Sequence, residues 1–369
     1  MKAIISGGGS GGHIFPAVAI AGAIKKRWPD AEVLFVGAEG RMEMEKVPAA
    51  GYEIVGLPIA GLQRKITLSN LWKNLQLPFR MLRSRTKVRR VLRRFNPDVV
   101  VGVGGFASEP TLKAAAAMGF PTLLQEQNSY AGLTNKMLAR RAERICVAYD
   151  GMGRFFPEEK IVFTGNPVRA DIEKMNASHD EGLAFFGLDP SKSTVLVVGG
   201  SLGARSINQM MLSNLESTVA KDIQIVWQTG KWGYDRAVAA VKSCGCEDRV
   251  KVHQFIQRMD MAYAAADAIV SRAGAIAISE LCIVGKPLIL IPSPNVAEDH
   301  QTKNAMSLVN KGAALMVRDD ECERKGFEVL GRLLADADGR GAMSKALKGL
   351  AVYGAADKIV DQIEYILNR

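Results

Sequence analysis

Two segments of this sequence follow the same pattern: a short apolar run, a glycine-rich turn and a segment of helical length. The first turn reads G-G-G-S-G-G-H at residues 7–13, directly after the apolar run at 2–6. The second reads G-G-S-L-G-A-R at 199–205, after the apolar run at 194–198. A strand that turns through glycines into a helix is typical of nucleotide-binding α/β domains. The repeat therefore predicts two Rossmann-like domains.

The rest of the chain alternates short β-branched runs with amphipathic segments, which favours parallel sheets covered by helices on both faces. The predicted strands lie at residues 2–6, 32–37, 98–103, 121–125, 144–147, 194–198, 224–228, 249–253, 268–271 and 287–291. A chain of 369 residues is long enough for two domains, and F-T-G-N-P-V-R at 163–169 has the composition of a linker. We therefore expect an α/β protein with domains at 1–165 and 166–351. A last helix at about 352–369 is expected to pack back on the first domain.

The composition is that of a globular protein. Hydrophobic residues make up 48% of the sequence and charged residues 23%, which excludes wholesale disorder. The first residues run straight into the first glycine turn, so we expect no export signal, and no apolar run approaches the ~20 residues of a membrane-spanning helix. The five cysteines include only a C-x-C pair, which fits neither a disulfide framework nor a C-x-x-C site. We expect reduced thiols and a protein that stays in the cytoplasm, in solution or on a membrane surface.

The formal net charge of +10 is concentrated in one stretch. Residues 55–96 contain no Asp or Glu, and their basic residues are Arg64, Lys65, Lys73, Arg80, Arg83, Arg85, Lys87, Arg89, Arg90, Arg93 and Arg94. Apolar and aromatic side chains lie among them, which is typical of a segment that binds a membrane interface. The region from Arg64 to Arg94 is therefore predicted to bind an anionic membrane surface. Nucleic acid is the alternative partner, but aromatic residues are sparse and no recognition motif occurs.

The first glycine turn can cradle a diphosphate or a sugar, because glycines allow close approach and the following helix presents N–H groups to an anion. The alternative is a tight turn without a ligand. The dinucleotide fingerprint also needs an acid at the end of the second strand, and here Glu39 is displaced from that place. His13 follows the turn and can act as a general base on a sugar hydroxyl, since histidine titrates near neutral pH. It can equally orient the loop through hydrogen bonds.

Polar residues follow several predicted strands in the positions where α/β proteins bind ligands. Ser201 in the second turn can donate to a phosphate oxygen, and Glu280 can accept the two hydroxyls of a ribose. The clusters Q-E-Q-N at 125–128 and D-H-Q-x-x-N at 299–304 can bind sugar hydroxyls. Without ligands, Glu280 is a solvated helix residue and Asp299 a helix cap.

A bound metal is not expected from this sequence. The D-A-D at 336–338 has the form of a metal-binding D-x-D pair, but it lies in a late amphipathic stretch and is interpreted as surface. No set of His, Cys and carboxylate residues has the spacing of metal ligands. We expect neither a metal nor another cofactor.

Taken together, these motifs resemble the MurG family of N-acetylglucosaminyltransferases, which have the glycosyltransferase-B (GT-B) fold. The matching segments are G-G-x-G-G-H-x-F-P at 8–16, G-x-G-G at 102–105, E-Q-N at 126–128, A-G-L-T-N-K at 131–136, G-N-P-V-R at 165–169, G-G-S-x-G-A-R at 199–205 and R-x-G-A at 272–275. The resemblance implies two Rossmann-like domains facing each other across a cleft. It implies transfer of N-acetylglucosamine from UDP-N-acetylglucosamine (UDP-GlcNAc) to the 4-hydroxyl of the N-acetylmuramyl-pentapeptide of lipid I, which forms lipid II for peptidoglycan.

The same resemblance assigns roles to individual residues. The first domain is expected to face the lipid acceptor and the membrane, and the second to bind the donor. The implied donor contacts are Ser10, Gly11, Gly12, Asn128, Arg169, Ser201, Ile256, Ala275, Ile276, Ala277, Ile278, Ser279, Glu280 and Gln301. Two positions depart from the family pattern: Gln125 stands where histidine is expected, and Glu109 where glycine is usual.

The expected reaction is a direct displacement with inversion. His13 is the first candidate for the base and Glu126 the alternative, while the diphosphate leaves toward Ser201, Arg169 and helix N–H groups. Rival activities are glycosylation of another lipid such as diacylglycerol, epimerisation of a sugar nucleotide, and a dinucleotide-dependent dehydrogenase, which the displaced acid and second glycine turn disfavour. The expected location is the cytoplasmic face of the plasma membrane, as a peripheral protein, with wall-synthesis proteins as further possible partners.

Overall fold

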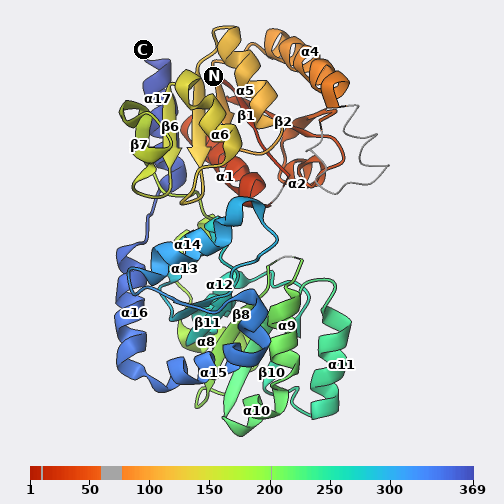
Figure 1. The fold of residues 1–369 in the computed structure, drawn as a ribbon, viewed down its shortest axis with the longest axis vertical. Coiled ribbons are helices and arrows are strands. Elements are labelled where there is room, and N and C mark those ends of the chain that lie inside the picture. Colours follow the sequence, from red (N-terminus) through yellow and green to blue (C-terminus); the bar gives the residue numbers. More distant parts are fainter. Residues whose placement is uncertain (10, 60–76, 201) are drawn as a thin grey trace. The chain divides into compact units, whose positions relative to one another are not determined.

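The computed structural model describes residues 1–9, 11–59, 77–200 and 202–369. The chain forms two compact units (Figure 1). Unit 1 comprises Met1–Val168 and Gly354–Arg369, and unit 2 comprises Arg169–Tyr353. The chain therefore passes between the units twice, after Val168 and after Tyr353, where the sequence places the boundaries after residues 165 and 351.

Unit 1 contains a seven-stranded parallel sheet in the order β3-β2-β1-β4-β5-β6-β7. The strands are β1 (Lys2–Ser6), β2 (Glu32–Ala38), β3 (Glu53–Leu57), β4 (Val99–Gly102), β5 (Thr122–Glu126), β6 (Arg144–Val147) and β7 (Ile161–Phe163). The strand order reverses between β1 and β4, and open α/β sheets bind ligands beyond the carboxyl ends of the strands at such a point. The first glycine turn and the loop after β4 both lie there.

The described helices of unit 1 are α1 (Gly11–Arg27), α2 (Glu43–Ala49), α4 (Leu77–Phe95), α5 (Ser108–Ala117), α6 (Leu133–Leu138), η1 (Ala139–Arg141), η2 (Met152–Arg154), η3 (Glu158–Lys160) and α17 (Ala355–Leu367). The last of these comes from the end of the chain and packs on α1 (Figure 1). Ile359, Val360 and Ile363 of α17 are buried in the same apolar cluster as α1. Arg27 of α1 also donates to Asp361 at 2.6 Å. Both ends of the chain therefore contribute to one core.

Unit 2 contains a six-stranded parallel sheet in the order β10-β9-β8-β11-β12-β13. The strands are β8 (Ser193–Val198), β9 (Ile223–Gln228), β10 (Val250–His253), β11 (Ala268–Ser271), β12 (Leu288–Leu290) and β13 (Leu315–Met316). The helices are α7 (Ala170–Glu173), α8 (His179–Phe186), α9 (Arg205–Leu212), α10 (Leu215–Ala220), α11 (Tyr234–Cys244), α12 (Met259–Ala265), α13 (Ala275–Val284), η4 (Ala297–Asp299), α14 (His300–Val309), η5 (Asp319–Glu321), α15 (Cys322–Ala335) and α16 (Ala337–Gly349). Here the order reverses between β8 and β11, beside the second glycine turn.

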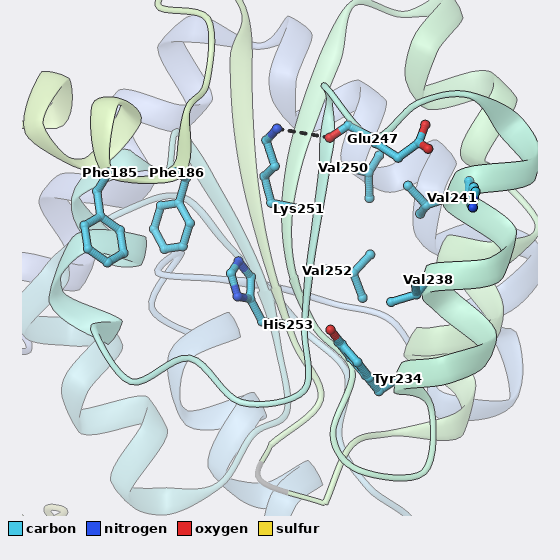
Figure 2. A pocket seen from close by; sticks show the side chains of 11 residues that line it. Phe185, Phe186, Tyr234, Val238, Val241, Glu247, Val250, Lys251, Val252 and His253 are labelled. Carbon is cyan, nitrogen blue, oxygen red and sulfur yellow. Dashed lines mark hydrogen bonds between the residues drawn. The ribbon is translucent and has the colours of Figure 1, made fainter.

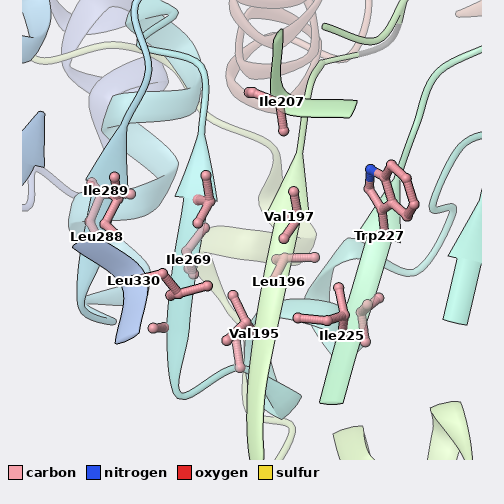
Figure 3. Close-up of a cluster of buried hydrophobic side chains, with 14 of the residues drawn as sticks. Val195, Leu196, Val197, Ile207, Ile225, Trp227, Ile269, Leu288, Ile289 and Leu330 are labelled. Carbon is pink, nitrogen blue, oxygen red and sulfur yellow. The ribbon is translucent and has the colours of Figure 1, made fainter. Parts of the chain in front are cut away.

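The core of unit 2 is formed by apolar side chains on both faces of its central strands. Figure 3 shows the consecutive residues 195–197 of β8 beside Ile225 and Trp227 of β9 and Ile269 of β11. Central strands of a parallel sheet are covered by helices on both faces, so their sequences are continuously apolar. Trp227 is fully buried, and its indole N–H donates to Asn208 Oδ1 at 3.1 Å. The predicted α/β class is therefore confirmed.

Candidate active site

The first glycine turn and the loop after β4 are interlocked in unit 1. Gly105 has a φ of +88°, and a Cβ atom on it would lie 2.4 Å from the carbonyl oxygen of Gly8. The hydroxyl of Ser108 at the start of α5 donates to the carbonyl oxygen of Ser6 at 2.5 Å. Only glycine allows these two backbones to approach so closely. The turn after β1 is therefore held by the loop after β4.

A buried carboxylate, Glu43, binds the backbone of the first glycine turn. Its side chain is 1% exposed, its Oε2 accepts from the Gly9 N–H at 2.9 Å, and its Oε1 accepts from the Ala38 N–H at 3.0 Å. The acid noted in the sequence, Glu39, instead forms an ion pair with Lys87 at 3.0 Å. Sequence reasoning missed Glu43, because nothing in the local pattern separates it from its acidic neighbours.

The imidazole of His13 is oriented by the same turn. Its Nδ1 lies 3.0 Å from the carbonyl oxygen of Gly8. A carbonyl oxygen can only accept, so in the neutral ring this hydrogen bond assigns the proton to Nδ1 and the lone pair to Nε2. A Cβ atom at Gly104 would lie 3.0 Å from Nε2, so a side chain at that position would crowd the imidazole. The geometry suits a general base that accepts a proton on Nε2.

The other candidate base, Glu126, is the centre of a hydrogen-bond network at the end of β5. Its Oε1 accepts from the backbone N–H and the side-chain amide of Asn128, at 3.1 and 3.2 Å. Its Oε2 accepts from the Gly132 N–H at 3.0 Å and from Asn135 Nδ2 at 2.9 Å. With four donors around a carboxylate that is 1% exposed, its lone pairs are already used. This arrangement fits a residue that organises the loop after β5, and Asn128 belongs to that loop.

The two departures from the family pattern both have structural partners. Gln125 is fully buried, and its Nε2 donates to Asn166 Oδ1 at 3.0 Å. Asn166 in turn donates to the carbonyl oxygen of Gln127 at 3.0 Å. Glu109 forms an ion pair with Lys113 one turn along α5, at 3.4 Å. Gln125 therefore links β5 by a hydrogen bond to Asn166, in the segment just before the boundary of unit 1 at Val168.

In unit 2, two of the predicted donor contacts pair with each other. Nε of Arg169, which precedes α7, donates to Glu280 Oε1 at 3.0 Å, and Nη2 approaches Oε2 at 3.5 Å. The buried hydroxyl of Tyr263 donates to the same Oε2 at 3.3 Å. Burial lowers the pKa of Arg169, but the Glu280 carboxylate raises it and the net result is a rise. Burial, and then the same carboxylate, raise the pKa of Tyr263 well above its usual range.

The second glycine turn is fixed against the end of β9. A Cβ atom on Gly203, whose φ is +84°, would lie 2.0 Å from the carbonyl oxygen of Thr229. The buried amide of Gln228 donates to the carbonyl oxygen of Gly200 at 3.1 Å. It also accepts from the N–H of Ile256 at 2.9 Å. Gln228, which the sequence gave no reason to select, thus connects the predicted contact Ile256 to the glycine turn.

A polar cavity of about 620 Å³ lies beside this turn. Its lining comprises Gly199, Gly203, Ala204, Arg205, Ser206, Gln209, Arg272, Ser293, Asn295, Gln301, Asp319 and Glu323. The predicted contact Gln301 is held there, because its Oε1 accepts from the Ser293 N–H at 2.8 Å. Arg272 donates to Asp319 Oδ1 at 2.5 Å and to the carbonyl oxygen of Ile291 at 3.0 Å. Backbone N–H groups, amides and a guanidinium are the groups that bind phosphates and sugar hydroxyls.

The remaining predicted contacts differ in what they can offer a ligand. Ile276, Ala277 and Ser279 are partly exposed on α13, and Ala275 opens that helix. Ile278 is buried in the core and its N–H donates to the carbonyl oxygen of Gly274, so its geometry supports a ligand contact least. The residues Gly11 and Gly12 open α1. Ser10 and Ser201 lie outside the described residues.

A second cavity of unit 2, of about 460 Å³, contains none of the predicted site residues. Figure 2 shows Phe185 and Phe186 on one side and Tyr234 and Val238 of α11 on the other, with His253 of the edge strand β10 between them. The lining is mostly apolar, so this cavity is distinct in chemistry from the one beside the glycine turn.

The described part of α4 is amphipathic. Ser84, Val88 and Leu92 are buried at helical spacing. The exposed basic residues are Arg83, Arg85, Arg89, Arg90, Arg93 and Arg94. Arg64, Lys65 and Lys73 lie outside the described residues. Among the helices that the structure describes, none is both long and apolar enough to cross a bilayer.

Metal ligands do not gather within residues 1–9, 11–59, 77–200 and 202–369. No three His, Cys, Asp or Glu side chains in these ranges are placed to hold an ion. The first carboxylate of the D-A-D sequence, Asp336, caps α16 by accepting from the Gly339 N–H at 2.8 Å. This gives Asp336 a structural role.

Two doubly wound parallel-sheet units, each with a glycine turn at its switch point, have the architecture of GT-B proteins, the fold class of many glycosyltransferases. Residues 3–147 match the glycosyltransferase family 28 N-terminal domain, and residues 194–359 match the C-terminal domain of that family. The chain belongs to glycosyltransferase family 28.

Curated relatives and a crystal structure agree with this assignment. The chain is 53% identical over 373 residues to the UDP-N-acetylglucosamine--N-acetylmuramyl-(pentapeptide) pyrophosphoryl-undecaprenol N-acetylglucosamine transferase of Parabacteroides distasonis, covering 100% of this chain and 99% of the relative. It is 58% identical over 319 residues to the transferase of the same name from Phocaeicola vulgatus, covering 86% and 84%. The crystal structure of Acinetobacter baumannii MurG is similar with a TM-score of 0.78 and 26% identity, covering 99% of each chain. The resemblance to the MurG family is confirmed.

Proposed function

We propose that this chain transfers N-acetylglucosamine from UDP-GlcNAc to the 4-hydroxyl of the N-acetylmuramyl-pentapeptide of lipid I, and so forms lipid II. The observation that carries the proposal is the 53% identity along the whole chain to a relative with that name. The acceptor hydroxyl attacks the anomeric carbon from the side opposite the leaving group, so the configuration inverts.

In this reaction His13 is the general base. As the acceptor O4 forms its bond to the anomeric carbon, its proton passes to Nε2 of His13, and the bond from that carbon to the β-phosphate oxygen breaks. A positioned base of this kind contributes about 10²–10⁴-fold to the rate. His13 is preferred to Glu126 because its Nδ1 hydrogen bond leaves the lone pair on Nε2, while the Glu126 carboxylate already accepts four hydrogen bonds.

Unit 2 binds the donor through Glu280 and Arg169. A carboxylate has about four lone-pair sites, and Glu280 uses three for Arg169 and Tyr263. A ribose needs two acceptor sites, so its hydroxyls displace the longest of these contacts, the 3.5 Å approach of Arg169 Nη2. The freed guanidinium N–H groups then donate to the diphosphate, as anion partners commonly do with arginine.

The departing diphosphate is stabilised without a metal. Arg169, the hydroxyl of Ser201 and the unpaired N–H groups at the start of α9 supply positive groups where charge develops. Gln301 in the polar cavity provides a further amide next to the glycine turn. Ser201 lies outside the described residues, and its role rests on the sequence motif.

The protein acts at the cytoplasmic face of the plasma membrane, where the lipid acceptor is presented. The exposed arginines of α4 support this location, because each basic residue near an anionic surface contributes about 1 kcal/mol of binding. The buried side of α4 is fastened to unit 1 through Val88 and Leu92. The arginine side is therefore available to headgroups.

The test is transfer of radiolabelled N-acetylglucosamine from UDP-GlcNAc to lipid-linked muramyl-pentapeptide by the purified protein. Label should enter the lipid fraction with this acceptor, and His13→Ala should slow the transfer by about 10²–10⁴-fold. Incorporation only into diacylglycerol would indicate a different lipid acceptor, and conversion of UDP-GlcNAc without any acceptor would indicate an epimerase. Either result, or full activity of His13→Ala, would contradict the corresponding part of the proposal.

A further inference from the structure

One peptide group joins the buried carboxylate of Glu43 to the imidazole of His13. The Gly9 N–H donates to Glu43 Oε2 at 2.9 Å, and the Gly8 carbonyl oxygen lies 3.0 Å from His13 Nδ1. This N–H and this carbonyl belong to the same planar unit, in which they point in opposite directions. We propose that Glu43 is a positioning residue for the base: through the Gly8–Gly9 peptide it fixes the orientation and the tautomer of His13.

The peptide needs such a partner because its two residues do not fix its orientation. Gly8 and Gly9 have φ values of +146° and +87°, and glycine has no Cβ atom that favours one orientation over the reverse. A reversed peptide would present an N–H to His13 and a carbonyl oxygen to the carboxylate. Since an ionised carboxylate only accepts, Glu43 selects the orientation in which the carbonyl faces His13.

Glu43 is itself held firmly. Its second oxygen accepts from the Ala38 N–H at 3.0 Å, and a Cβ atom at Gly37 would lie 2.6 Å from its Cγ. A Cβ atom at Gly8 would lie 2.2 Å from its Oε1, so the carboxylate fills the space beside the turn. Hydrogen bonds to a carboxylate are short and strong, and buried chains of hydrogen bonds polarise one another. The charge of Glu43 therefore strengthens the bond that holds the proton on Nδ1.

This arrangement also decides what the first glycine turn does. The Gly9 N–H of this turn is occupied by a carboxylate from the same chain. The negative charge of Glu43 makes this part of the turn unfavourable for a diphosphate. The Gly8–Gly9 part of the turn therefore serves to position His13, and any contact of the turn with the donor falls to Ser10, Gly11 and Gly12. The catalytic consequence rests on the proposed role of His13 as base, whereas the tautomer can be measured independently.

The direct test is nitrogen-15 NMR of histidine-labelled protein, which distinguishes the two neutral tautomers. The chain has four histidines, so His13→Gln identifies the His13 signals. In the native protein we expect neutral His13 to carry its proton on Nδ1. In Glu43→Gln the amide has only one acceptor oxygen for two N–H groups, and we expect a mixture of tautomers. A native His13 protonated on Nε2, or an unchanged tautomer in Glu43→Gln, would overturn the proposal. The native tautomer is measured without Glu43→Gln, so a native His13 protonated on Nε2 overturns the proposal even if that variant fails to fold.

The kinetic test compares Glu43→Gln with Glu45→Gln. Both residues lie on α2, and the chemical change is the same. The Glu45 side chain, however, is 80% exposed and forms an ion pair with its neighbour Lys46. We expect Glu43→Gln to lower kcat by about 10-fold or more, as loss of the correct histidine tautomer does elsewhere, with KM for UDP-GlcNAc unchanged. Glu45→Gln should match the native protein in both. Equal kcat in the two variants would reject the positioning role of Glu43 while leaving the transferase function intact. Absence of transfer by the native protein would instead reject the function.

Discussion

Arg169 and Glu280 form an ion pair, with Nε 3.0 Å from Oε1, that joins the first residue of unit 2 to the helix after its second switch-point strand. The pair is extended by the Tyr263 hydroxyl, which donates to the other carboxylate oxygen at 3.3 Å. The Glu280 carboxylate therefore stabilises unit 2 through Arg169 and Tyr263. It can also exchange its longest hydrogen bond for one to a ribose hydroxyl. This makes Glu280 the residue of unit 2 whose removal should have two separable effects.

Glu280→Ala is expected to weaken UDP-GlcNAc binding and to lower stability. Loss of two hydrogen bonds from ribose hydroxyls to a carboxylate corresponds to about a 10- to 100-fold rise in Kd. The buried Tyr263 hydroxyl loses its acceptor, which costs about 1–3 kcal/mol in the free energy of unfolding. Titration calorimetry and urea unfolding measure the two effects. Tyr263→Phe is the matched control, because it removes only the hydroxyl and should keep donor affinity. Unchanged donor affinity in Glu280→Ala would reject the ribose assignment.

Glu126→Gln is expected to affect stability more than it affects proton transfer. In the glutamine side chain an NH₂ group replaces one carboxylate oxygen. This NH₂ group cannot accept the hydrogen bonds that Asn128, Gly132 and Asn135 donate to that oxygen, so some of them are lost. We expect a loss of about 2–4 kcal/mol in urea unfolding. The rate of the remaining activity should still rise with pH as the base loses its proton, and His13→Gln should remove this rise. If Glu126→Gln abolished that rise while its stability stayed native, Glu126 would be the base.

Charge reversal on α4 should weaken membrane binding. The double variant Arg89→Glu, Arg93→Glu changes two exposed residues, and removing the attraction of two basic groups costs about 2 kcal/mol, or about 30-fold in binding. Co-sedimentation with vesicles containing phosphatidylglycerol measures this change at fixed salt. Arg318→Glu, Arg324→Glu alters net charge equally at exposed positions of unit 2. Equal losses in both double variants would show that net charge alone, rather than α4, governs binding.

Transfer should continue in excess chelator. Among the residues that the structure describes, no three metal-ligating side chains are grouped, and the proposed diphosphate partners are an arginine, a hydroxyl and backbone N–H groups. Activity is measured after dialysis against EDTA, with and without added Mg²⁺ or Mn²⁺. A loss of activity that either ion restores would contradict a metal-free mechanism.

Three buried thiols should resist alkylation in the native protein. Burial raises the pKa of Cys146, of Cys282 and of Cys322 to about 12. A raised pKa means that the reactive thiolate forms only as the pH approaches that value, so at pH 8 these thiols stay protonated. Mass spectrometry after iodoacetamide should find them unmodified in the folded protein and modified in urea. Rapid modification of Cys146 under native conditions would contradict its burial.

The strands that the sequence predicted are those whose surroundings make them uniformly apolar. β1 and β6 begin and end where their apolar runs do, because helices cover both faces. The strands that were not predicted, β3, β7 and β13, lie at sheet edges. β7 and β13 have only three and two residues, so their apolar runs are too short to indicate a strand, and β3 is interrupted by Gly56.

The candidate site was predictable where a motif fixes a residue relative to its own strand and helix. His13 and Glu280 are of this kind, since each follows a glycine turn at a strand end. Glu43 and Gln228 were not predictable, because each acts on a loop that is distant in sequence and only the folded sheet brings them together. Glu43 is 34 residues from Gly9, and acidic neighbours on both sides carry the same local signal.

The return of α17 to unit 1 has a consequence for how the protein is made on the ribosome. Unit 2 is one continuous segment that is complete once Tyr353 has been synthesised. Unit 1 lacks Ile359, Val360 and Ile363, which cover α1, until α17 has been synthesised. Unit 2 can therefore complete its core before unit 1, whereas the amino-terminal domain usually folds first in multidomain chains. Nascent unit 1 therefore has an uncovered apolar face while unit 2 is being synthesised, and a chain that stopped within α17 would leave α1 uncovered.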